Sequence, residues 1–328
     1  MRPVSVKRLV NLYVQSPEFN RLRDRTQLDY KRFLKVLTDT FGEKTANAVS
    51  GKDARLAYEE WVKRGIQLAN HVSVVAGRAY RYGLDMEYVK NNPFTLVRKI
   101  TPAPRKVTWT EDQVREFLNV AYGDFVYRNV GLIVQMAYEW CQRVGDMRML
   151  EWQCIDFDNN RLNLIQSKRG AVVHLPISES LLDMLKEQRD DFDFQKYVVP
   201  MPTPRDGEYI PFSMERLSKI GRRIMRQAGL PEELRLMDLR RTGTTEMVEA
   251  GVPLPQIMSV TGHANPQSVK PRNRSLSQET YTISIIVYYH VSRPKKRRWI
   301  LKISFFGIFH RERVTAQRDS ERESRDFC

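Results

Sequence analysis

Residues 236–270 read LMDLRRTGTTEMVEAGVPLPQIMSVTGHANPQSVK, and this stretch predicts two consecutive helices. Adjacent arginines open the first helix, and Gly251 follows it where a helix commonly ends in a left-handed residue. The second helix is expected over residues 254–260. Its buried side is expected to comprise Ile257, Met258 and Val260.

Arg240 lies at the start of the first helix and His263 follows the second, so the two side chains can converge on one point. A guanidinium binds a phosphate through paired hydrogen bonds, and an imidazole supplies a further hydrogen bond or a proton. Taken alone, an Arg-Arg pair on a helix is more often a solvated face. A histidine after glycine is likewise more often a helix cap, so the local pattern leaves both interpretations open.

The whole stretch resembles the second signature box of the tyrosine recombinase (phage integrase) family, which combines His-x-x-Arg, an Ala-Gly turn and Leu-Gly-His. The matching positions are Asp238-Leu239-Arg240, Glu249-Ala250-Gly251 and Thr261-Gly262-His263. Met237 departs from the pattern, because it stands where the family has its first histidine. The resemblance covers about residues 5–270. It implies a mainly α fold with a small β-sheet (α+β), made of an N-terminal helical core-binding (SAM-like) domain and a C-terminal tyrosine-recombinase catalytic domain.

Arg143 follows a long apolar helix predicted over residues 125–140, and we expect it to close that buried helix. A buried charge without a partner is costly, so an ion pair with Asp146 or Glu151 is one explanation. The stretch also resembles the first recombinase box, in which the arginine is followed by an acid and then by Leu-x-Trp, matched here through Trp152. That resemblance implies that Arg143 binds a phosphate.

Apolar and polar residues alternate through residues 161–177, RLNLIQSKRGAVVHLPI, on both sides of a basic turn, and this predicts a β-hairpin. A basic hairpin turn is often simply exposed. The Gln-Ser-Lys-x-Gly arrangement resembles the family's mobile hairpin, whose lysine enters the site as general acid. The resemblance gives that role to Lys168.

The chain of 328 residues carries a formal net charge of +15, and its basic residues are spread along the whole length. This charge favours a polyanionic partner, and nucleic acid fits the distribution better than a membrane surface does. The three cysteines lack metal-ligand spacing and indicate a reducing compartment. No signal peptide or membrane-spanning run is evident, so we expect a cytoplasmic protein that associates with the nucleoid of a bacterial host.

Residues 1–100 are predicted to form a small helical bundle, with helices over residues 6–13, 25–41, 53–64 and 69–82. No residue set there resembles a catalytic centre. The basic residues form either a solvated face or a set of phosphate contacts. The candidates for DNA contact are Lys31, Arg32, Lys35, Arg78 and Arg81, together with Lys106 in the segment that follows.

Residues 101–108 contain two prolines and no periodicity, so we expect them to link two domains. A basic linker lying along DNA would let both domains clamp a duplex, and a plain solvated hinge is the alternative. The catalytic domain is expected over residues 109–272, with further helices over residues 181–189 and 212–228. Residues 273–328 differ in texture and are expected to form an atypical basic tail.

The resemblance implies a site for phosphoryl transfer that uses neither a metal nor a cofactor. Arg143 and Arg240 would meet the charge of the transition state, Lys168 would protonate the 5′-oxygen, and His263 would bond a non-bridging oxygen or assist the nucleophile. In the family a tyrosine attacks, and the 3′-phosphotyrosyl intermediate permits rejoining without ATP. The implied partners are double-stranded DNA attachment sites, a homotetramer assembled on them, and an accessory directionality factor or a host DNA-bending protein.

Arg272 occupies the position of the family's nucleophilic tyrosine, nine residues after His263. The tail could be a native extension that delivers Tyr281 or Tyr288 from a shifted position. It could also be a shifted reading frame, an explanation favoured because the resemblance stops near Lys270, or the chain could be a silent DNA binder. We therefore expect a site-specific recombinase of phage or prophage with Tyr281 as its candidate nucleophile. A catalytically inactive DNA-binding relic or regulator of the same fold is the alternative.

Overall fold

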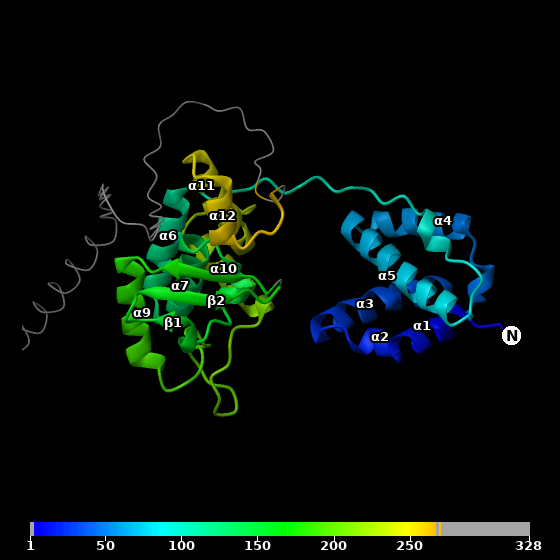
Figure 1. Ribbon diagram of the computed structural model, residues 1–328, viewed down its shortest axis with the longest axis horizontal. Coiled ribbons are helices and arrows are strands. Elements are labelled where there is room, and N and C mark those ends of the chain that lie inside the picture. The colour runs from blue at the N-terminus through cyan, green and yellow to red at the C-terminus, as the bar shows by residue number, and fades with distance from the viewer. Residues whose placement is uncertain (1–2, 169, 267–268, 270–328) are drawn as a thin grey trace, which may run out of the picture. The chain divides into compact units, whose positions relative to one another are not determined.

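The computed structural model describes residues 3–168, 170–266 and 269 (Figure 1). The chain divides into two compact units, Met1–Arg105 and Lys106–Cys328, called here the N-terminal and C-terminal units. The expected tail, with its candidate Tyr281, and the position of Arg272 lie outside the described residues.

Helices that pack around one apolar core build the N-terminal unit. They are α1 (Val6–Val14), α2 (Pro17–Asn20), α3 (Asp24–Phe41), the 3-10 helix η1 (Ala46–Ala48), α4 (Gly51–Lys63), α5 (Ile66–Asp85) and the 3-10 helix η2 (Pro93–Leu96). Reciprocal capping bonds between Ser50 and Asp53 start α4 by satisfying amides that lack helical partners. The four predicted helices are present, and α5 extends beyond residues 69–82 at both ends because no residue there interrupts the helical pattern.

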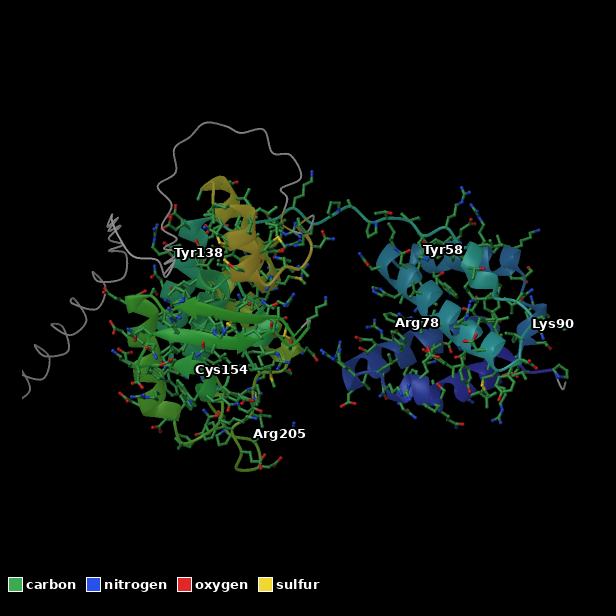
Figure 2. The ribbon with its side chains drawn as sticks, in the orientation of Figure 1. Tyr58, Arg78, Lys90, Tyr138, Cys154 and Arg205 are labelled. Atoms are coloured by element: carbon green, nitrogen blue, oxygen red, sulfur yellow. The ribbon has the colours of Figure 1, made fainter. Side chains whose placement is uncertain are left out.

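Polar contacts hold the end of this unit together. The Tyr58 hydroxyl donates to Oδ1 of Asn70 and accepts from the amide of Ile100, both at 2.7 Å, so the segment that follows η2 is fastened to α4 and α5 (Figure 2). On the surface, the Arg78 guanidinium lies 5.6 Å from the centre of the Tyr30 ring. Aromatic residues therefore accompany basic ones on α3 and α5.

Helices and a three-stranded sheet form the C-terminal unit. They are α6 (Glu111–Tyr122), α7 (Phe125–Glu139), α8 (Val144–Met147), η3 (Trp152–Cys154), β1 (Ile155–Asp156), β2 (Arg161–Ile165), β3 (Val172–Pro176), α9 (Glu179–Phe192), α10 (Met214–Gln227), η4 (Leu236–Asp238), α11 (Leu239–Glu249) and α12 (Leu254–Thr261). The strands are antiparallel in the order β1-β2-β3, and Ile165 pairs with Val172 next to the turn, so the predicted hairpin is confirmed.

The core of this unit lies around α7, which is buried on almost every side. Leu162 and Leu164 on β2, and Val173 and Leu175 on β3, point into the same core, while the residues between them face outward. The sheet thus has one buried face, as its period-two pattern predicted.

Three details differ from the expectations. Helix α7 ends at Glu139, and Arg143 is instead the residue that caps the start of α8, a turn too short for a periodicity signal. Helix α9 continues to Phe192, beyond the expected end at residue 189. On α12, Met258 and Val260 are only half-buried, because Ile257 and Thr261 take the inward positions.

Candidate active site

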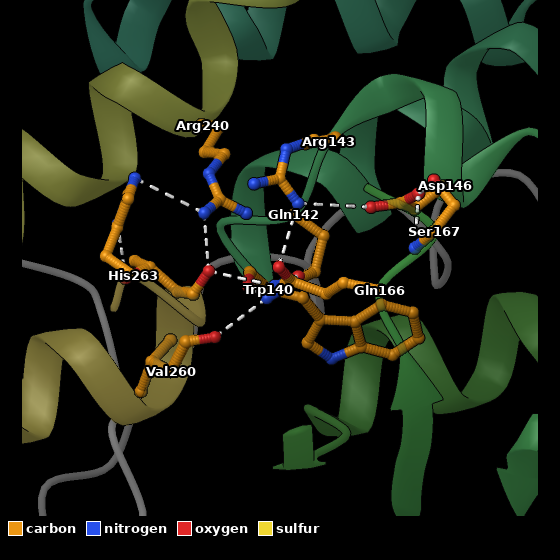
Figure 3. A network of polar contacts seen from close by, with 10 residues as sticks. Trp140, Gln142, Arg143, Asp146, Gln166, Ser167, Arg240, Val260 and His263 are labelled. Atoms are coloured by element: carbon orange, nitrogen blue, oxygen red, sulfur yellow. Dashed lines mark hydrogen bonds and ion pairs between the residues drawn. The ribbon is translucent and has the colours of Figure 1, made fainter. Parts of the chain in front are cut away.

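Arg240 and His263 meet at the end of α12 (Figure 3). Nη2 of Arg240 donates to the carbonyl oxygen of Thr261 and lies 3.3 Å from Nε2 of His263. The predicted convergence of a helix start on a helix end is therefore confirmed. Gly262, with a φ of 66°, ends α12 in the left-handed region and turns the chain so that His263 follows on this side.

The neighbours of His263 assign its protons. The Thr261 hydroxyl donates to the carbonyl of Ile257 at 2.7 Å, so its oxygen is left to accept from Nδ1 of His263, also at 2.7 Å. Nδ1 then carries the proton, and the lone pair of Nε2 faces the Arg240 guanidinium. The network holds the imidazole in a single tautomer beside a cation.

Arg143 approaches from the segment between α7 and α8 and is 24% exposed. Its Nη1 donates to Oε1 of Gln166 at 2.8 Å and lies 3.6 Å from Oδ2 of Asp146. The sequence offered two acids as ion-pair partners of Arg143, and Asp146 is the one in contact with it. Glu151 instead pairs with Lys196, which follows α9, at 2.8 Å. The ion pair and a phosphate-binding role are compatible, because a guanidinium has five N–H donors.

The β2–β3 turn is docked against this arginine. The hydroxyl of Ser167 donates to Oδ1 of Asp146, and its amide lies 3.3 Å from the same oxygen. Lys168, the expected general acid, is the next residue and is exposed in the turn. Lys168 thus lies one residue beyond Ser167, whose side chain is docked on Asp146, the ion-pair partner of Arg143.

Two more features belong to the start of α11. Met237, where the resemblance has a histidine, is 72% exposed and contributes no polar group. Trp109 anchors this region, because its amide donates to the Thr242 hydroxyl at 2.9 Å and its indole N–H donates to the carbonyl of Arg235 at 3.0 Å. Trp109, near the start of the C-terminal unit, therefore holds residues 235–242, the segment that contains Arg240.

A half-buried acid lies further along α11. Glu246 accepts hydrogen bonds from the Tyr138 hydroxyl at 3.1 Å to both carboxyl oxygens, and burial raises the pKa of Glu246 to about 7. Burial and the nearby carboxylate also raise the pKa of Tyr138 above its usual range. Tyr138 is therefore held as a neutral donor and is not an activated nucleophile.

The candidate DNA-contact residues of the N-terminal unit are all exposed. Lys35 and Arg81 pair with acids one turn along their own helices, Asp39 at 3.0 Å and Asp85 at 3.1 Å. Lys31 and Arg32 lie on α3, Arg78 and Arg81 on α5, and Lys106 at the start of the C-terminal unit.

Sequence patterns gave no role to Gln142, Gln166 or Thr261, although the last two lie within the quoted motifs, and these three residues connect the site. Gln142 adjoins Arg143, and Gln166 precedes the turn that carries Lys168. A glutamine close to a candidate arginine or lysine, at the end of an apolar stretch, is the sequence signal that could have identified both. Among the described residues no cluster of His, Cys, Asp or Glu could hold a metal ion. In the same part of the chain, no helix combines the length and the apolar character needed to cross a bilayer.

Comparisons with known proteins agree on one family. The model of the phage integrase family matches residues 108–278. A tyrosine recombinase XerC-like protein of Caldanaerobacter subterraneus subsp. tengcongensis is 23% identical over 226 residues, 57% of this chain and 56% of the relative. The integrase of Escherichia phage HK022 is 24% identical over 177 residues, 52% of this chain and 48% of the relative. The chain thus spans about half the length of these curated relatives.

Solved structures share the fold. A lambda integrase dimer bound to a COC′ core site superposes with a TM-score of 0.70 at 16% identity, covering 85% of this chain and 81% of that one. The Tn1549 transposon integrase in complex with circular intermediate DNA gives a TM-score of 0.64 at 17% identity, covering 81% and 94%. The expected α+β fold, mainly helical with a small sheet, is confirmed.

Proposed function

Because this chain belongs to the phage integrase family, we propose that it is a site-specific DNA recombinase. It would cut and rejoin DNA through a covalent 3′-phosphotyrosyl intermediate, during integration or excision of mobile DNA such as a prophage. The observation that carries this proposal is the convergence of Arg143, Arg240 and His263 around Gln166 and the Thr261 carbonyl.

The two guanidiniums supply the charge that phosphoryl transfer requires. Arg143 and Arg240 would bind the non-bridging oxygens of the scissile phosphate with N–H donors that are already in place, so charge that develops on phosphorus is met without reorganisation. Asp146 orients Arg143 and offsets part of the charge of the cluster. His263, held with its proton on Nδ1, would act through Nε2 on the phosphate or the nucleophile.

Proton transfer completes the reaction. The tyrosine oxygen would bond to phosphorus while the bond from phosphorus to the 5′-oxygen breaks, and Lys168 would give that oxygen its proton. Rejoining is the reverse, with a 5′-hydroxyl of a second duplex as nucleophile. The exposed turn that carries Lys168 supports this role, because the lysine can reach toward DNA while Ser167 stays docked.

A tyrosine supplies the nucleophile in the proposed reaction. Arg272 stands at the family's tyrosine position, and Tyr281 is our candidate, with Tyr288 and Tyr289 beyond it. The second candidate function, an inactive DNA-binding relic or regulator, is favoured by Arg272 itself. We keep residues 273–328 as an atypical basic tail, either native or from a shifted reading frame.

The structures of relatives suggest the assembly. Lambda integrase has been solved as a dimer on a core site and as a tetramer on a Holliday junction. By analogy, we propose that two domains, residues 1–100 and 109–272, bind a double-stranded attachment site and are joined by a linker at residues 101–108. We also propose that four copies assemble on two duplexes. A directionality factor or host bending protein would assist at the nucleoid in the cytoplasm.

Covalent trapping on DNA tests the function. The probe is a nicked duplex selected for binding from a random pool, mixed with protein without metal and resolved on a denaturing gel. We expect a shifted band that Tyr281→Phe abolishes, and Arg240→Ala should slow its formation by about 10²–10³-fold because a charge-stabilising donor is lost. The matched control is Arg241→Ala, which removes the neighbouring exposed arginine and should leave the rate within about threefold.

The other outcomes are equally informative. DNA binding without any covalent band, in the wild type and in both arginine variants, would support the inactive relic. A band that forms at the wild-type rate in Arg240→Ala would exclude the proposed site. A band that survives Tyr281→Phe but not Tyr288→Phe would move the nucleophile without changing the function.

A further inference from the structure

Two buried glutamines lie between the arginines of the site. Gln142 and Gln166 have no exposed surface, and together they are called here the amide bridge. Gln142 comes from the segment after α7, and Gln166 from the end of β2 just before the turn. A buried amide is tolerated only when its donors and acceptor are bonded, so their contacts show what they hold.

The hydrogen bonds of the amide bridge form a continuous chain. Nε2 of Gln142 donates to the carbonyls of Trp140 and Val260, at 2.7 and 2.8 Å, and its Oε1 accepts from Nε2 of Gln166 at 2.7 Å. Nε2 of Gln166 also donates to the Thr261 carbonyl at 2.8 Å, and its Oε1 accepts from Arg143. Both donors and the acceptor of each amide are used.

This pattern fixes the orientation of Gln166. Turning its amide over would place N–H groups against the N–H groups of Arg143 and a carbonyl against the Thr261 carbonyl, so two favourable contacts would become repulsive. Gly262 packs against the same amide, since a Cβ at that position would lie 2.6 Å from Nε2 of Gln166. The side chain has neither a second polar arrangement nor room to move toward α12.

The Thr261 carbonyl joins the two arginines through Gln166. It accepts from Nε2 of Gln166 on one side and from Nη2 of Arg240 on the other. Carbonyls at the end of a helix lack helical partners and carry the negative end of the helix dipole, so the end of α12 attracts both donors. The connection runs from Arg143 through Gln166 and the Thr261 carbonyl to Arg240, and Figure 3 shows Gln166 between the two arginines.

We propose that Gln166 is a positioning residue that sets the Arg143 guanidinium relative to Arg240 and fixes the hairpin from which Lys168 extends. The proposal deepens the function proposed above and rests on it. A neutral amide suits this task, because it orients Arg143 and leaves its positive charge available to the phosphate. A carboxylate in its place would orient Arg143 but would also cancel that charge. Gln166 has no role as an acid, a base or a phosphate ligand.

A ligation assay tests this role without a tyrosine nucleophile. The substrate is a nicked duplex, selected for binding from a random pool, whose 3′-phosphate carries a p-nitrophenyl ester opposite a 5′-hydroxyl. The 5′-oxygen bonds to phosphorus, p-nitrophenolate leaves with the bonding pair, and the hydroxyl proton passes to a base of the site or to solvent. The rate at saturating protein and the duplex Kd are measured separately, and Arg240→Ala serves as the inactive reference.

Gln166→Met keeps the length and removes every polar atom of the amide. We expect the ligation rate to fall at least tenfold while the Kd changes less than twofold, because DNA binding depends on many other contacts. The matched control is Gln188→Met on α9. Gln188 is as buried as Gln166 and lies outside the site, and its Nε2 donates to Oδ1 of Asn129 at 3.1 Å and to the carbonyl of Val198 at 2.8 Å. It should lower thermal stability to a similar extent and leave the rate unchanged.

Two further variants keep the test decisive if Gln166→Met does not fold. Gln166→Glu retains an acceptor for Arg143 but adds a negative charge beside it, and we expect at least the same loss of rate. Gln142→Met removes the partner on the other side of Gln166, and a smaller loss is expected. Unchanged rates in the folded variants would overturn the positioning role, provided that the wild type ligates and Arg240→Ala does not. A wild type that binds the duplex but accelerates no ligation would instead overturn the proposed function, and the positioning role with it.

Discussion

The exposed ion pairs of the N-terminal unit and the amide bridge of the C-terminal unit place polar groups in opposite ways. In the N-terminal unit, ion pairs such as Lys35–Asp39 and Arg81–Asp85 join residues four apart on one helix and remain exposed. In the C-terminal unit, Gln166 is fully buried and bonds a residue 95 positions away. Exposed pairs exchange readily with water and with phosphates, whereas buried amides have one arrangement. Exposed ion pairs suit contact with a DNA backbone at many alternative positions, and buried amides suit chemistry at one phosphorus atom.

Gly262→Ala should produce the largest loss of stability among the changes that probe this comparison. The new methyl group would overlap the Gln166 amide, and the residue would have to keep a left-handed φ of 66°. We expect a loss of about 3 kcal/mol in unfolding free energy, from backbone strain and from broken buried hydrogen bonds. Chemical denaturation measures it.

The matched control for that change is Gly251→Ala. Gly251 has a similar φ of 71° at the end of α11, but nothing lies within 4 Å of its added methyl group. Backbone strain alone should cost about 1 kcal/mol. Equal losses at the two glycines would show that the packing against Gln166 is unimportant, and the contrast between the units would be weakened.

Glu246→Gln should have an intermediate effect that depends on pH. The pKa of Glu246 is raised from 4.5 to about 7 in the folded protein, so between those values the folded state binds more protons than the unfolded state. The stability that comes from the neutral acid is complete below pH 4.5 and is lost as pH rises to 7. After allowance for partial exposure, the wild type should lose about 2 kcal/mol across this window, and the variant should not.

Denaturation at a series of pH values checks this prediction. Glu249→Gln is the control, because it removes the same charge from an exposed position on the same helix and should keep most of the pH dependence. A Glu246→Gln variant whose stability varies with pH as the wild type's does would show that Glu246 is ionised throughout in the folded protein.

Asp39→Asn should have the smallest effect. Both side chains of the Lys35–Asp39 pair are exposed, and such a pair four residues apart contributes less than about 0.5 kcal/mol. Denaturation in low salt measures the change, with Asp24→Asn at the start of the same helix as a comparison. A loss above about 1 kcal/mol would mean that this exposed ion pair is ordered in the way a buried contact is, which would weaken the contrast.

Local patterns were sufficient for much of the molecule. Glycines at positions 251 and 262 predicted the ends of α11 and α12, period-two alternation predicted the hairpin, and the order of boxes predicted that Arg240 meets His263. Each of these features is decided by residues that are close in sequence or by a short motif. The role of Lys168 and of the DNA-contact residues stays a prediction.

The connecting groups could not be predicted in this way. The hairpin motif contains Gln166 but does not predict that its side chain is buried, because the burial depends on α12, which begins 88 residues later. The contact of Gln142 with Val260 joins residues 118 positions apart, and no local periodicity records it. Apolar periodicity predicts Arg143 at the end of α7, because a helix as short as α8 leaves no periodic signal.

The hydrogen bond between Trp109 and Thr242 joins residues 133 positions apart, so it forms only after residue 242 has been synthesised. Units fold in the order of their synthesis, and contacts between distant positions form late. The N-terminal unit can fold once residue 105 has left the ribosome, whereas the arginine pair must wait for residues 235–263. A chain that stops earlier carries Arg143 and the N-terminal helices but lacks Arg240 and the Thr261 carbonyl. If those helices bind DNA as proposed, each prematurely ended copy occupies a target without cutting it and competes with the finished enzyme.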